Sequence, residues 1–463
     1  MLANIANTFA NCFKIPELKS RILFTLVVLA ICRVAAMIPI PGLDGAALAD
    51  YFDQLAKNAN ADGSGLLGMY SMFTGGALER CAVGALGIMP YISATIIIQL
   101  LSAVVPRLSK LAREEGGRVK IIQYSRYLTV LLCLGQGLFM TIGWENASSV
   151  FPNFSGRLVL YSDSAIWWYR VQTVIILTTG TLLLMWLGEQ ITERGIGNGI
   201  SLVISVGILA RLPQAATSLG DMFRSADETG RANPFYFIAM VLLLLAVIAG
   251  VIAVTQAQRK VPVQYAQRAQ GRRVIAGGTS FMPLRVNYAG VMPIIFAQAI
   301  LMFPQKILEF AGRGLEVRVL GQVATWLQEG ELLYMILYSL MILFFSYFWV
   351  ATQFNEIQIA DDLKKYGGYI PGVRPGQATS TFLHNAMSRI TLAGALFLTV
   401  IAIIPIMLYR LMNVPYPVAT FFGGTSMLIL VGVILDTMRQ MESHLLMRHY
   451  DGFLKKGRLR GRF

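Results

Sequence analysis

Few side chains in this sequence could catalyse a reaction. Its 463 residues include three histidines: His384, which we expect in a loop, and His444 and His449, which we expect in a C-terminal tail. The zinc-binding motif HExxH is absent, and so is the Gly-Lys pair that a phosphate-binding P-loop requires. The sequence therefore predicts no catalytic residues, no metal site and no bound cofactor.

One glycine-rich stretch, RGIGNGIS, has a spacing that could hold a phosphate. Its glycines, Gly195, Gly197 and Gly199, are arranged somewhat like those of a dinucleotide-binding loop. Such a loop follows a β-strand, whereas no strand is expected before this stretch and a spanning helix is expected after it. The stretch is therefore a weak signal for nucleotide binding.

The four cysteines show no pattern of a reactive site. None forms a CxxC pair, and most lie in or beside apolar runs: Cys12, Cys32, Cys81 and Cys133. We expect them to pack as small apolar side chains rather than to form disulfides or bind metal.

Charged side chains avoid the centres of the apolar runs. The nearest acids lie at the ends of the expected helices: Glu189, Glu309, Glu331, Glu356 and Asp436. Because transporters coupled to protons or sodium place titratable groups within their spans, this pattern disfavours such coupling. Four arginines also fall near span ends, and we expect their guanidinium groups to extend to the membrane interface: Arg33, Arg126, Arg170 and Arg211.

The composition indicates a membrane protein. Of the residues, 55% are hydrophobic and 14% are charged, whereas soluble domains carry about a quarter charged residues. About twenty apolar residues cross a bilayer, and such runs occur at 21–40, 81–105, 121–142, 165–188, 199–217, 234–256, 289–311, 331–354, 386–410 and 417–436. The first run resembles a signal peptide, but Arg33 interrupts it and we expect a retained helix. The sequence predicts an all-α integral membrane protein with ten transmembrane helices.

Basic residues are distributed unevenly between the two sides of the predicted membrane. Roughly 25 lysines and arginines lie on the side of the termini and about 8 on the other, so the positive-inside rule makes both termini cytoplasmic. The cytoplasmic segment 257–288 is basic and contains no acid, as expected of a surface that meets an anionic partner. The net charge of +14 comes without a basic stripe interleaved with aromatic residues, so DNA binding is not indicated.

One segment is too short to cross the membrane. Asp62–Arg80 has an apolar core, Leu66–Phe73, that glycines bracket. Non-spanning backbone is tolerated at membrane depth only where protein buries it or water fills a cavity. The segment is either such a buried piece or a helix on the outer surface, and the residues alone leave both alternatives open.

Seven motifs occur in the order and at spacings compatible with one known family. They are IPIPG (38–42), MFTGGALER (72–80), GIMPYISATIIIQLL (87–101), GEQITERGIGNGIS (188–201), VPVQYAQRAQGRR (261–273), YIPGVRPGQ (369–377) and FGGTS (422–426). The sequence resembles the SecY family along nearly its whole length.

The resemblance implies an hourglass channel between two inverted five-helix halves, residues 1–218 and 219–463. It implies a passive channel of the bacterial cytoplasmic (inner) membrane, not an enzyme. The channel would move unfolded secretory proteins across the membrane and release membrane segments sideways into the bilayer. The ATPase SecA or the translating ribosome would supply the energy.

A constricting ring of apolar side chains is implied at six positions: Ile88, Ile92, Ile200, Ile204, Ile295 and Ile429. Residues four apart share a helix face, so each of the first two pairs can point inward together. An apolar constriction blocks ions and water by dewetting. Isoleucine in a spanning helix otherwise faces lipid or core, so the motif register alone selects these six.

The short segment 62–80 would be the plug helix of such a channel. The resemblance assigns the seal to Leu66, Leu67, Met69, Tyr70, Met72 and Phe73, and the hinge to Gly75 and Gly76. The second, third, seventh and eighth helices would form a lateral gate, where Ser93, Gln99 and Gln298 are polar groups in apolar runs. Because unsatisfied polar groups are costly in hydrocarbon, pairing across the closed gate or within one half would satisfy them.

Two basic cytoplasmic segments, 257–288 and 355–385, would dock the partners. Arg268, Arg272 and Arg273 in the first and Arg374 in the second match positions implied to engage the ribosome and SecA. Guanidinium groups suit phosphate and carboxylate, although these arginines could equally serve membrane topology alone. The implied partners are the subunits SecE and SecG, SecA, the ribosome with its RNA, signal peptides, nascent chains and membrane lipid.

Two other functions compete with a protein channel. The scarcity of mid-membrane acids disfavours a secondary transporter of small solutes, and the placement of the histidines disfavours an intramembrane enzyme. The short segment 62–80 favours the channel.

Overall fold

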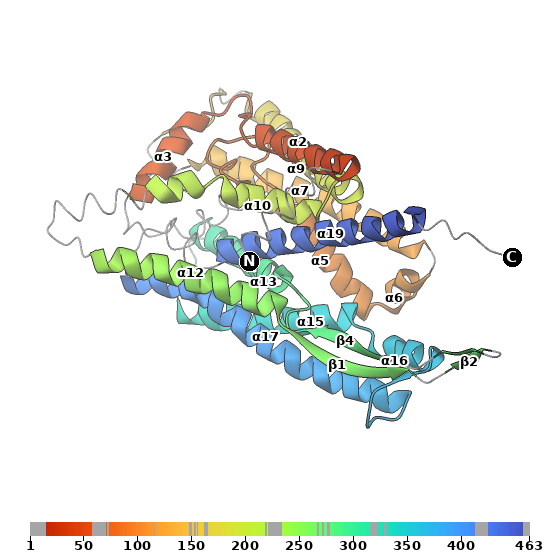
Figure 1. The fold of residues 1–463 in the computed structure, drawn as a ribbon. Helices are drawn as coiled ribbons and strands as arrows, with labels where there is room; N and C mark the ends of the chain where they lie inside the picture. Colours follow the sequence, from red (N-terminus) through yellow and green to blue (C-terminus); the bar gives the residue numbers. More distant parts are fainter. Residues whose placement is uncertain are drawn as a thin grey trace. The chain divides into compact units, whose positions relative to one another are not determined.

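The computed structural model is mostly helical and forms two compact units, which are described separately (Figure 1). It describes residues 15–57, 71, 74–114, 116–147, 151, 154, 156–161, 165–217, 220, 234–265, 268–270, 273–275, 278–314, 322–323, 325–327, 331–412 and 425–456. The first unit comprises Met1–Arg231, Pro415–Val418 and Ile429–Phe463. The second comprises Ala232–Val414 and Ala419–Leu428.

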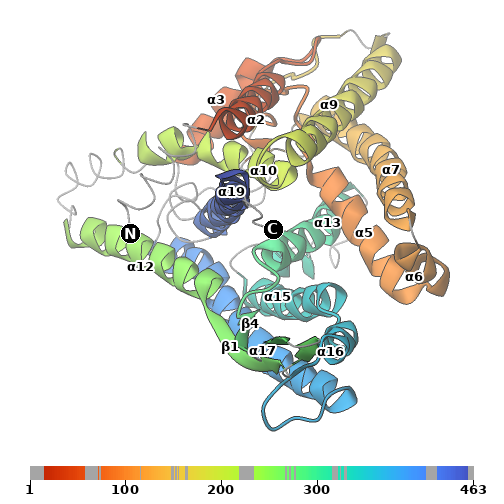
Figure 2. The ribbon, with the colours of Figure 1, turned by 45° about the vertical axis from the view of Figure 1, so that its right-hand side comes forward.

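The first unit is built around one long helix, α9. Its helices are α2 (Pro16–Ala35), α3 (Gly45–Lys57), α5 (Met89–Val104), α6 (Pro106–Arg113), α7 (Gly117–Glu145), α9 (Ile166–Arg194), α10 (Gly199–Leu209) and most of α19 (Thr425–Lys456). Helix α9 packs against α7, α10 and α2, and α7 also packs against α5 (Figure 2). The unit therefore brings the starts of α5 and α10 close to the same supporting helix.

The second unit combines apolar helices with a small sheet. Its helices are α12 (Pro234–Gln256), α13 (Met292–Gly314), α15 (Leu332–Gln353), α16 (Glu356–Lys365) and α17 (Gln377–Met412). Helix α15 packs between α13 and α17. Strands β1 (Gln258–Tyr265), β4 (Thr279–Arg285) and β5 (Gly368–Tyr369) form an antiparallel sheet in the order β4-β1-β5. Strands β2 (Arg268–Gln270) and β3 (Arg273–Ile275) form a second ladder.

These strands correct the prediction of an all-α chain. Val261 and Val263 are buried and the residues between and beside them are more exposed, which is the alternation of a half-buried strand. The high basic charge of 257–288 obscured this pattern. His384 is also misplaced by the sequence analysis, because it lies within α17 and its Nδ1 is 3.0 Å from Glu356 Oε1 on α16. Helix α19 likewise extends to Lys456, well past the predicted end at 436.

Five helices among the described residues are long and apolar enough to cross a membrane. They cover Val119–Glu145, Ile166–Arg194, Gly199–Thr217, Leu332–Lys365 and Gln377–Ile404, and shorter apolar helices cover Met89–Val104, Leu244–Gln256 and Met292–Leu301. The count of ten spans therefore stays a prediction.

The run predicted at 81–105 is helical only from Met89 onward. Residues 75–88 form consecutive turns, in which Gly75, Gly76 and Gly87 have positive φ. Their backbone groups pair with the chain after α2: Ile40 N donates to Cys81 O at 2.9 Å, and Val83 N donates to Ile38 O at 2.9 Å. We call residues 74–88 the buried turn segment, because its small side chains are almost inaccessible.

Helix α9 touches the buried turn segment through a glycine. A Cβ atom built at Gly180 would lie 2.2 Å from Val83 O, which is closer than any side chain can approach. The contact is with backbone, so no flexible side chain can move aside. Gly180 is therefore required for the backbone of α9 to approach the segment that precedes α5.

Two ion pairs bracket the hairpin of α7 and α9. Arg126 donates to Glu189 at 3.1 and 2.7 Å, and Arg170 donates to Glu145 at 3.0 Å through both Nε and Nη2. Nineteen residues separate Arg126 from Glu145, and nineteen separate Arg170 from Glu189. That separation is about 28 Å along a helix, close to the thickness of a bilayer core of about 30 Å. The spacing fits pairs that lie at the two membrane interfaces.

The contact at Gly180 predicts opposite effects for two glycine substitutions. Gly180→Ala should destabilise the protein by about 2 kcal/mol, because the Val83 backbone must shift. Gly135→Ala on α7 is the matched control, since a Cβ atom at this position would have nothing within 4 Å and alanine favours a helix. Thermal unfolding of the detergent-solubilised protein measures both variants. Equal midpoints would contradict the close contact.

Candidate functional site

The glycine-rich stretch RGIGNGIS is the turn that starts α10. Asn198 caps the helix, because its Oδ1 accepts from Ile200 N at 3.2 Å and from Ser201 N at 3.3 Å. Gly197 has φ +91°, and a Cβ at Gly199 would lie 1.9 Å from Gly188 O. The glycines therefore serve a tight connection between α9 and α10.

This turn is tied to three elements of the first unit. Ile196 N donates to Thr25 Oγ1 of α2 at 3.1 Å, Gly199 N donates to Thr192 Oγ1 of α9 at 2.9 Å, and Gly197 N donates to Gln440 Oε1 of α19 at 2.9 Å. Ile200 and Ile204 follow on the first two turns of α10. The bonds thus fix the start of the helix that carries two predicted ring residues.

The start of α5 is fixed by the buried turn segment. Ile88 is the N-cap residue and accepts a backbone hydrogen bond from Ile92 N at 3.2 Å. Both side chains are buried, with exposed fractions of 3% and 6%. Ile97, five residues further along, is 39% exposed and so lies on another face of α5.

The six predicted ring residues are divided between the two units. Ile88, Ile92, Ile200, Ile204 and Ile429 belong to the first unit, and Ile295 belongs to the second. All are buried except Ile200, which is half-buried and has its Cγ1 facing Gly188 of α9. Their assembly into one ring stays a prediction.

Most of the predicted plug lies outside the described residues. This applies to Leu66, Leu67, Met69, Tyr70, Met72 and Phe73. The two predicted hinge glycines are described, with φ +64° at Gly75 and +86° at Gly76. A Cβ at Gly75 would lie 2.9 Å from the Cα of Gly207, so the chain here packs directly against the backbone of α10.

Two arginines contact the stretch around the predicted hinge glycines, Gly75 and Gly76, which we call the hinge region. The sequence analysis missed both contacts. Arg33 Nη1 donates to Gly75 O at 3.0 Å, and Arg211 Nη2 contacts the Glu79 carboxylate and Ser71 Oγ. All four arginines that we expected to extend to the interface have protein partners, and the pairs of Arg126 and Arg170 are compatible with that position. The equal spacing of opposite charges on successive spans was the available signal for the α7–α9 pairs.

The predicted gate residues lie in both units. Ser93 and Gln99 are half-buried on α5, and the backbone oxygen of Gln99 accepts from Ser102 Oγ at 2.7 Å. Gln298 on α13 is 5% exposed, and its Oε1 has no hydrogen-bond partner within the described part of the chain. Burying a hydrogen-bond acceptor without a partner is unfavourable. The Oε1 of Gln298 is therefore a candidate to accept a hydrogen bond from a donor that the described residues do not show.

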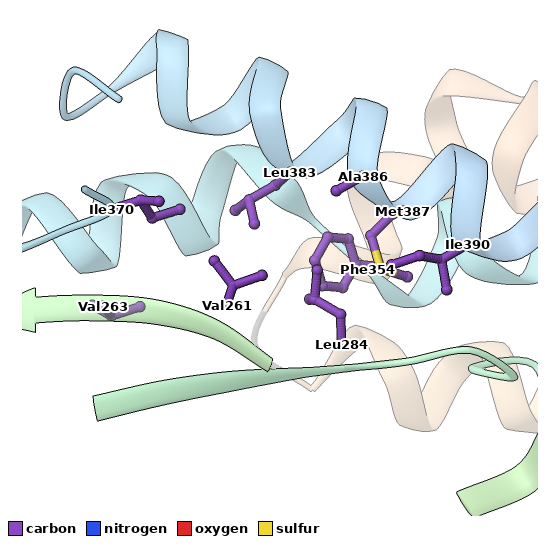
Figure 3. Packing of buried hydrophobic residues seen from close by; sticks show 9 residues of the cluster. All are labelled: Val261, Val263, Leu284, Phe354, Ile370, Leu383, Ala386, Met387 and Ile390. Carbon is purple, nitrogen blue, oxygen red and sulfur yellow. The ribbon is translucent and has the colours of Figure 1, made fainter. Parts of the chain in front are cut away.

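The basic antiparallel pair of strands β1 and β4 packs against an apolar cluster (Figure 3). Val261 and Val263 of β1 and Leu284 of β4 pack with residues of α17 and of the connections around α16; the remaining members are Phe354, Ile370, Leu383, Ala386, Met387 and Ile390. Leu383 is fully inaccessible, at 0%. The cluster therefore packs the two predicted docking segments, 257–288 and 355–385, against one another.

The predicted docking arginines are described to different extents. Arg374 is exposed in a turn that Gly372 and Gly376 form with positive φ, and its backbone oxygen accepts from Thr379 Oγ1 at 2.9 Å. Arg268 and Arg273 lie on the paired strands β2 and β3, and Arg272 lies outside the described residues. Ile370 anchors the turn of Arg374 in the apolar cluster.

Comparison with known proteins assigns the chain to a family. The SecY family model matches residues 82–438. The chain is 44% identical, over 98% of its length and 99% of the other, to the protein translocase subunit SecY of Chlamydia trachomatis. It is 43% identical to the Escherichia coli subunit of the same description, over 96% of both chains. This chain belongs to the SecY family.

Solved structures with SecY-like folds agree with this assignment. A structure described as a protein conducting channel matches with a TM-score of 0.62 at 18% identity, over 92% of both chains. Sec61 in a canine ribosome-channel complex from the endoplasmic reticulum matches with a TM-score of 0.61 at 18% identity, over 92% of both chains. The predicted resemblance to the SecY family is therefore confirmed, together with a mostly helical fold.

Proposed function

We propose that this chain is a protein-conducting channel, which moves unfolded secretory proteins across a membrane and releases membrane segments sideways into the bilayer. The observation that carries the proposal is its relationship, over nearly its whole length, to proteins described as protein translocase subunit SecY. The channel itself is passive. SecA or the translating ribosome supplies the energy, and the ribosome-bound Sec61 neighbour supports the second source.

In this proposal ten helices form an hourglass of two inverted halves, residues 1–218 and 219–463. The five long apolar helices and the three shorter ones support a membrane domain of this size. The channel lies in the bacterial inner membrane with both termini in the cytoplasm, as the basic segments favour. SecE and SecG complete the complex.

The proposed constriction is the ring of six isoleucines. An apolar lining excludes water from a narrow pore because it offers no hydrogen bonds, and excluded water means excluded ions. The burial of Ile88, Ile92 and Ile204 at the starts of two fixed helices supports a constriction at their level. Gln298, whose Oε1 has no partner among the described residues, would pair with Ser93 or Gln99 across the closed lateral gate or with a group of its own half.

The proposed plug is the segment 62–80, with Leu66–Phe73 as the seal and Gly75 and Gly76 as the hinge. One fold neighbour, 19% identical with a TM-score of 0.60, is described as having a plug domain that stabilises the closed state and maintains a membrane seal. Both glycines have positive φ, and glycine adopts a wider range of backbone conformations than other residues, which supports a hinge here.

The ring predicts that polar substitutions will make the membrane leak. Ile92→Ser with Ile204→Ser should raise ion conductance in planar bilayers modestly, and sharply when residues 66–73 are also deleted, because hydroxyl groups let water enter the constriction. Ile97→Ser is the control, since this side chain is exposed on another face of α5. Equal conductance of the Ile92 and Ile97 variants would show that the wrong face has been chosen.

The docking arginines predict a binding defect without a folding defect. Arg374→Glu combined with Arg272→Glu and Arg273→Glu should weaken binding of SecA and of ribosomes at least tenfold, because several charge-assisted bonds are lost. A pull-down with SecA and flotation with ribosomes measure this effect. Reversal of three other cations on the side predicted to be cytoplasmic, Arg107, Lys110 and Lys120, keeps the net charge equal and should leave binding intact, because none of them lies in the two docking segments. If both triple variants bind alike, only overall charge matters.

A further inference from the structure

Three charged side chains converge on the hinge region of the first unit. Arg211 lies in the turn after α10, just before Pro213, whose ring cannot continue the helix. Its Nη2 contacts both Glu79 and Ser71, and its Nη1 donates to Gln214 Oε1 at 3.3 Å. Arg33, near the end of α2, donates to Gly75 O. Helix α2 and the turn after α10 therefore both bond to one short stretch of chain.

The residues that Arg33 and Arg211 contact are evenly spaced along that stretch. Ser71, Gly75 and Glu79 are four residues apart, and Gly76 N also donates to Ser71 O at 2.9 Å. The contacts lie on both sides of the two hinge glycines. A rotation about Gly75 or Gly76 that carried the preceding chain away would have to break the bonds to Ser71 and Gly75.

The Arg211–Glu79 pair is shielded from solvent. Each side chain is only 14% exposed, and Arg211 Nε is buried without a hydrogen-bond partner among the described residues. Arg33 is repelled by Arg80 and by Arg211, and Glu79 is the acidic partner of Arg211. Removing one member of a shielded pair leaves the other uncompensated, which is strongly unfavourable.

We propose that Arg33 and Arg211 form a latch that holds Ser71 and residues 74–79 in place, and that opening of the proposed channel breaks the Arg211–Glu79 pair. Arg211 and Arg33 are positioning residues in this proposal. The inference rests on the proposed function for its effect on the channel. The contacts of Arg33 and Arg211 with this stretch all lie within the first unit.

Charge reversal tests the latch with two readouts. Arg211→Glu and Glu79→Arg should each raise the conductance of the idle channel in planar bilayers at least about tenfold, and the double reversal should restore it to within about twofold of the parent. Hydrogen exchange of the backbone amides at 74–80 should accelerate in the single variants and return to the parent rate in the double variant. The milder pair Arg211→Gln and Glu79→Gln serves if a reversal fails to fold.

Arg126→Glu is the matched control. It breaks the ion pair with Glu189 elsewhere in the same unit without touching the hinge region, so neither readout should change. Equal responses from Arg126 and Arg211 variants would mean general loosening and would overturn the latch. Unchanged exchange at 74–80 would overturn it whatever the conductance. Faster exchange with unchanged conductance, while the Ile92 and Ile204 variants conduct, would overturn its role in closure and leave the channel proposal standing.

Discussion

Peptide groups in the interior of a protein or a bilayer have no water to bond with, and in the first unit a non-helical stretch meets this constraint. Residues 75–88 are consecutive turns, yet Ala77, Cys81, Ala82 and Ala85 are fully inaccessible. Such a segment is stable in a bilayer only if protein bonds its peptide groups and covers it. The chain after α2 supplies the bonds, and Gly180 lets the backbone of α9 provide the cover.

The position of the proposed constriction follows from that arrangement. Helix α5 begins at Met89 because the preceding turns, with Gly87 at φ +59°, prevent an earlier start. Ile88 and Ile92 are therefore placed by the buried turn segment, and Ile200 and Ile204 by the capped turn at Asn198. The same segment carries Glu79, which Arg211 holds. The two predicted hinge glycines, Glu79 and the start of α5 thus belong to one local packing arrangement.

Sequence reasoning predicted the long helices well and the irregular parts poorly. The runs 165–188 and 331–354 correspond to α9 and α15, because twenty apolar residues in a row have few alternatives to a helix. The run 81–105 has the same composition, but its first eight residues are turns that depend on contacts with residues 35–40 and with α9. Hydropathy contains no information about such partners. The sequence analysis did not predict strands β1 and β4, because the basic residues of 257–288 were interpreted as a docking surface and the alternation of buried and exposed side chains was overlooked.

The candidate site shows the same division. Motif register selected Ile88, Ile92 and Ile204, and these side chains are buried at helix starts, although their assembly into a ring stays a prediction. The contacts of Arg33 and Arg211 could not be predicted from the sequence, because an arginine near a span end can equally extend its guanidinium group to the membrane interface. Only the fold brings Glu79 and Gly75 to these guanidinium groups.

Site-specific photocrosslinking tests the central claim, passage of a polypeptide through this chain, most directly. A photoreactive amino acid is placed at Ile92, at Ile204 or at Leu131, which is 65% exposed on α7. A secretory protein is then stalled during transport into vesicles that contain the assembled complex. The account predicts adducts between the stalled chain and positions 92 and 204, and none with position 131. Adducts at all three positions alike, or at position 131 alone, would contradict it.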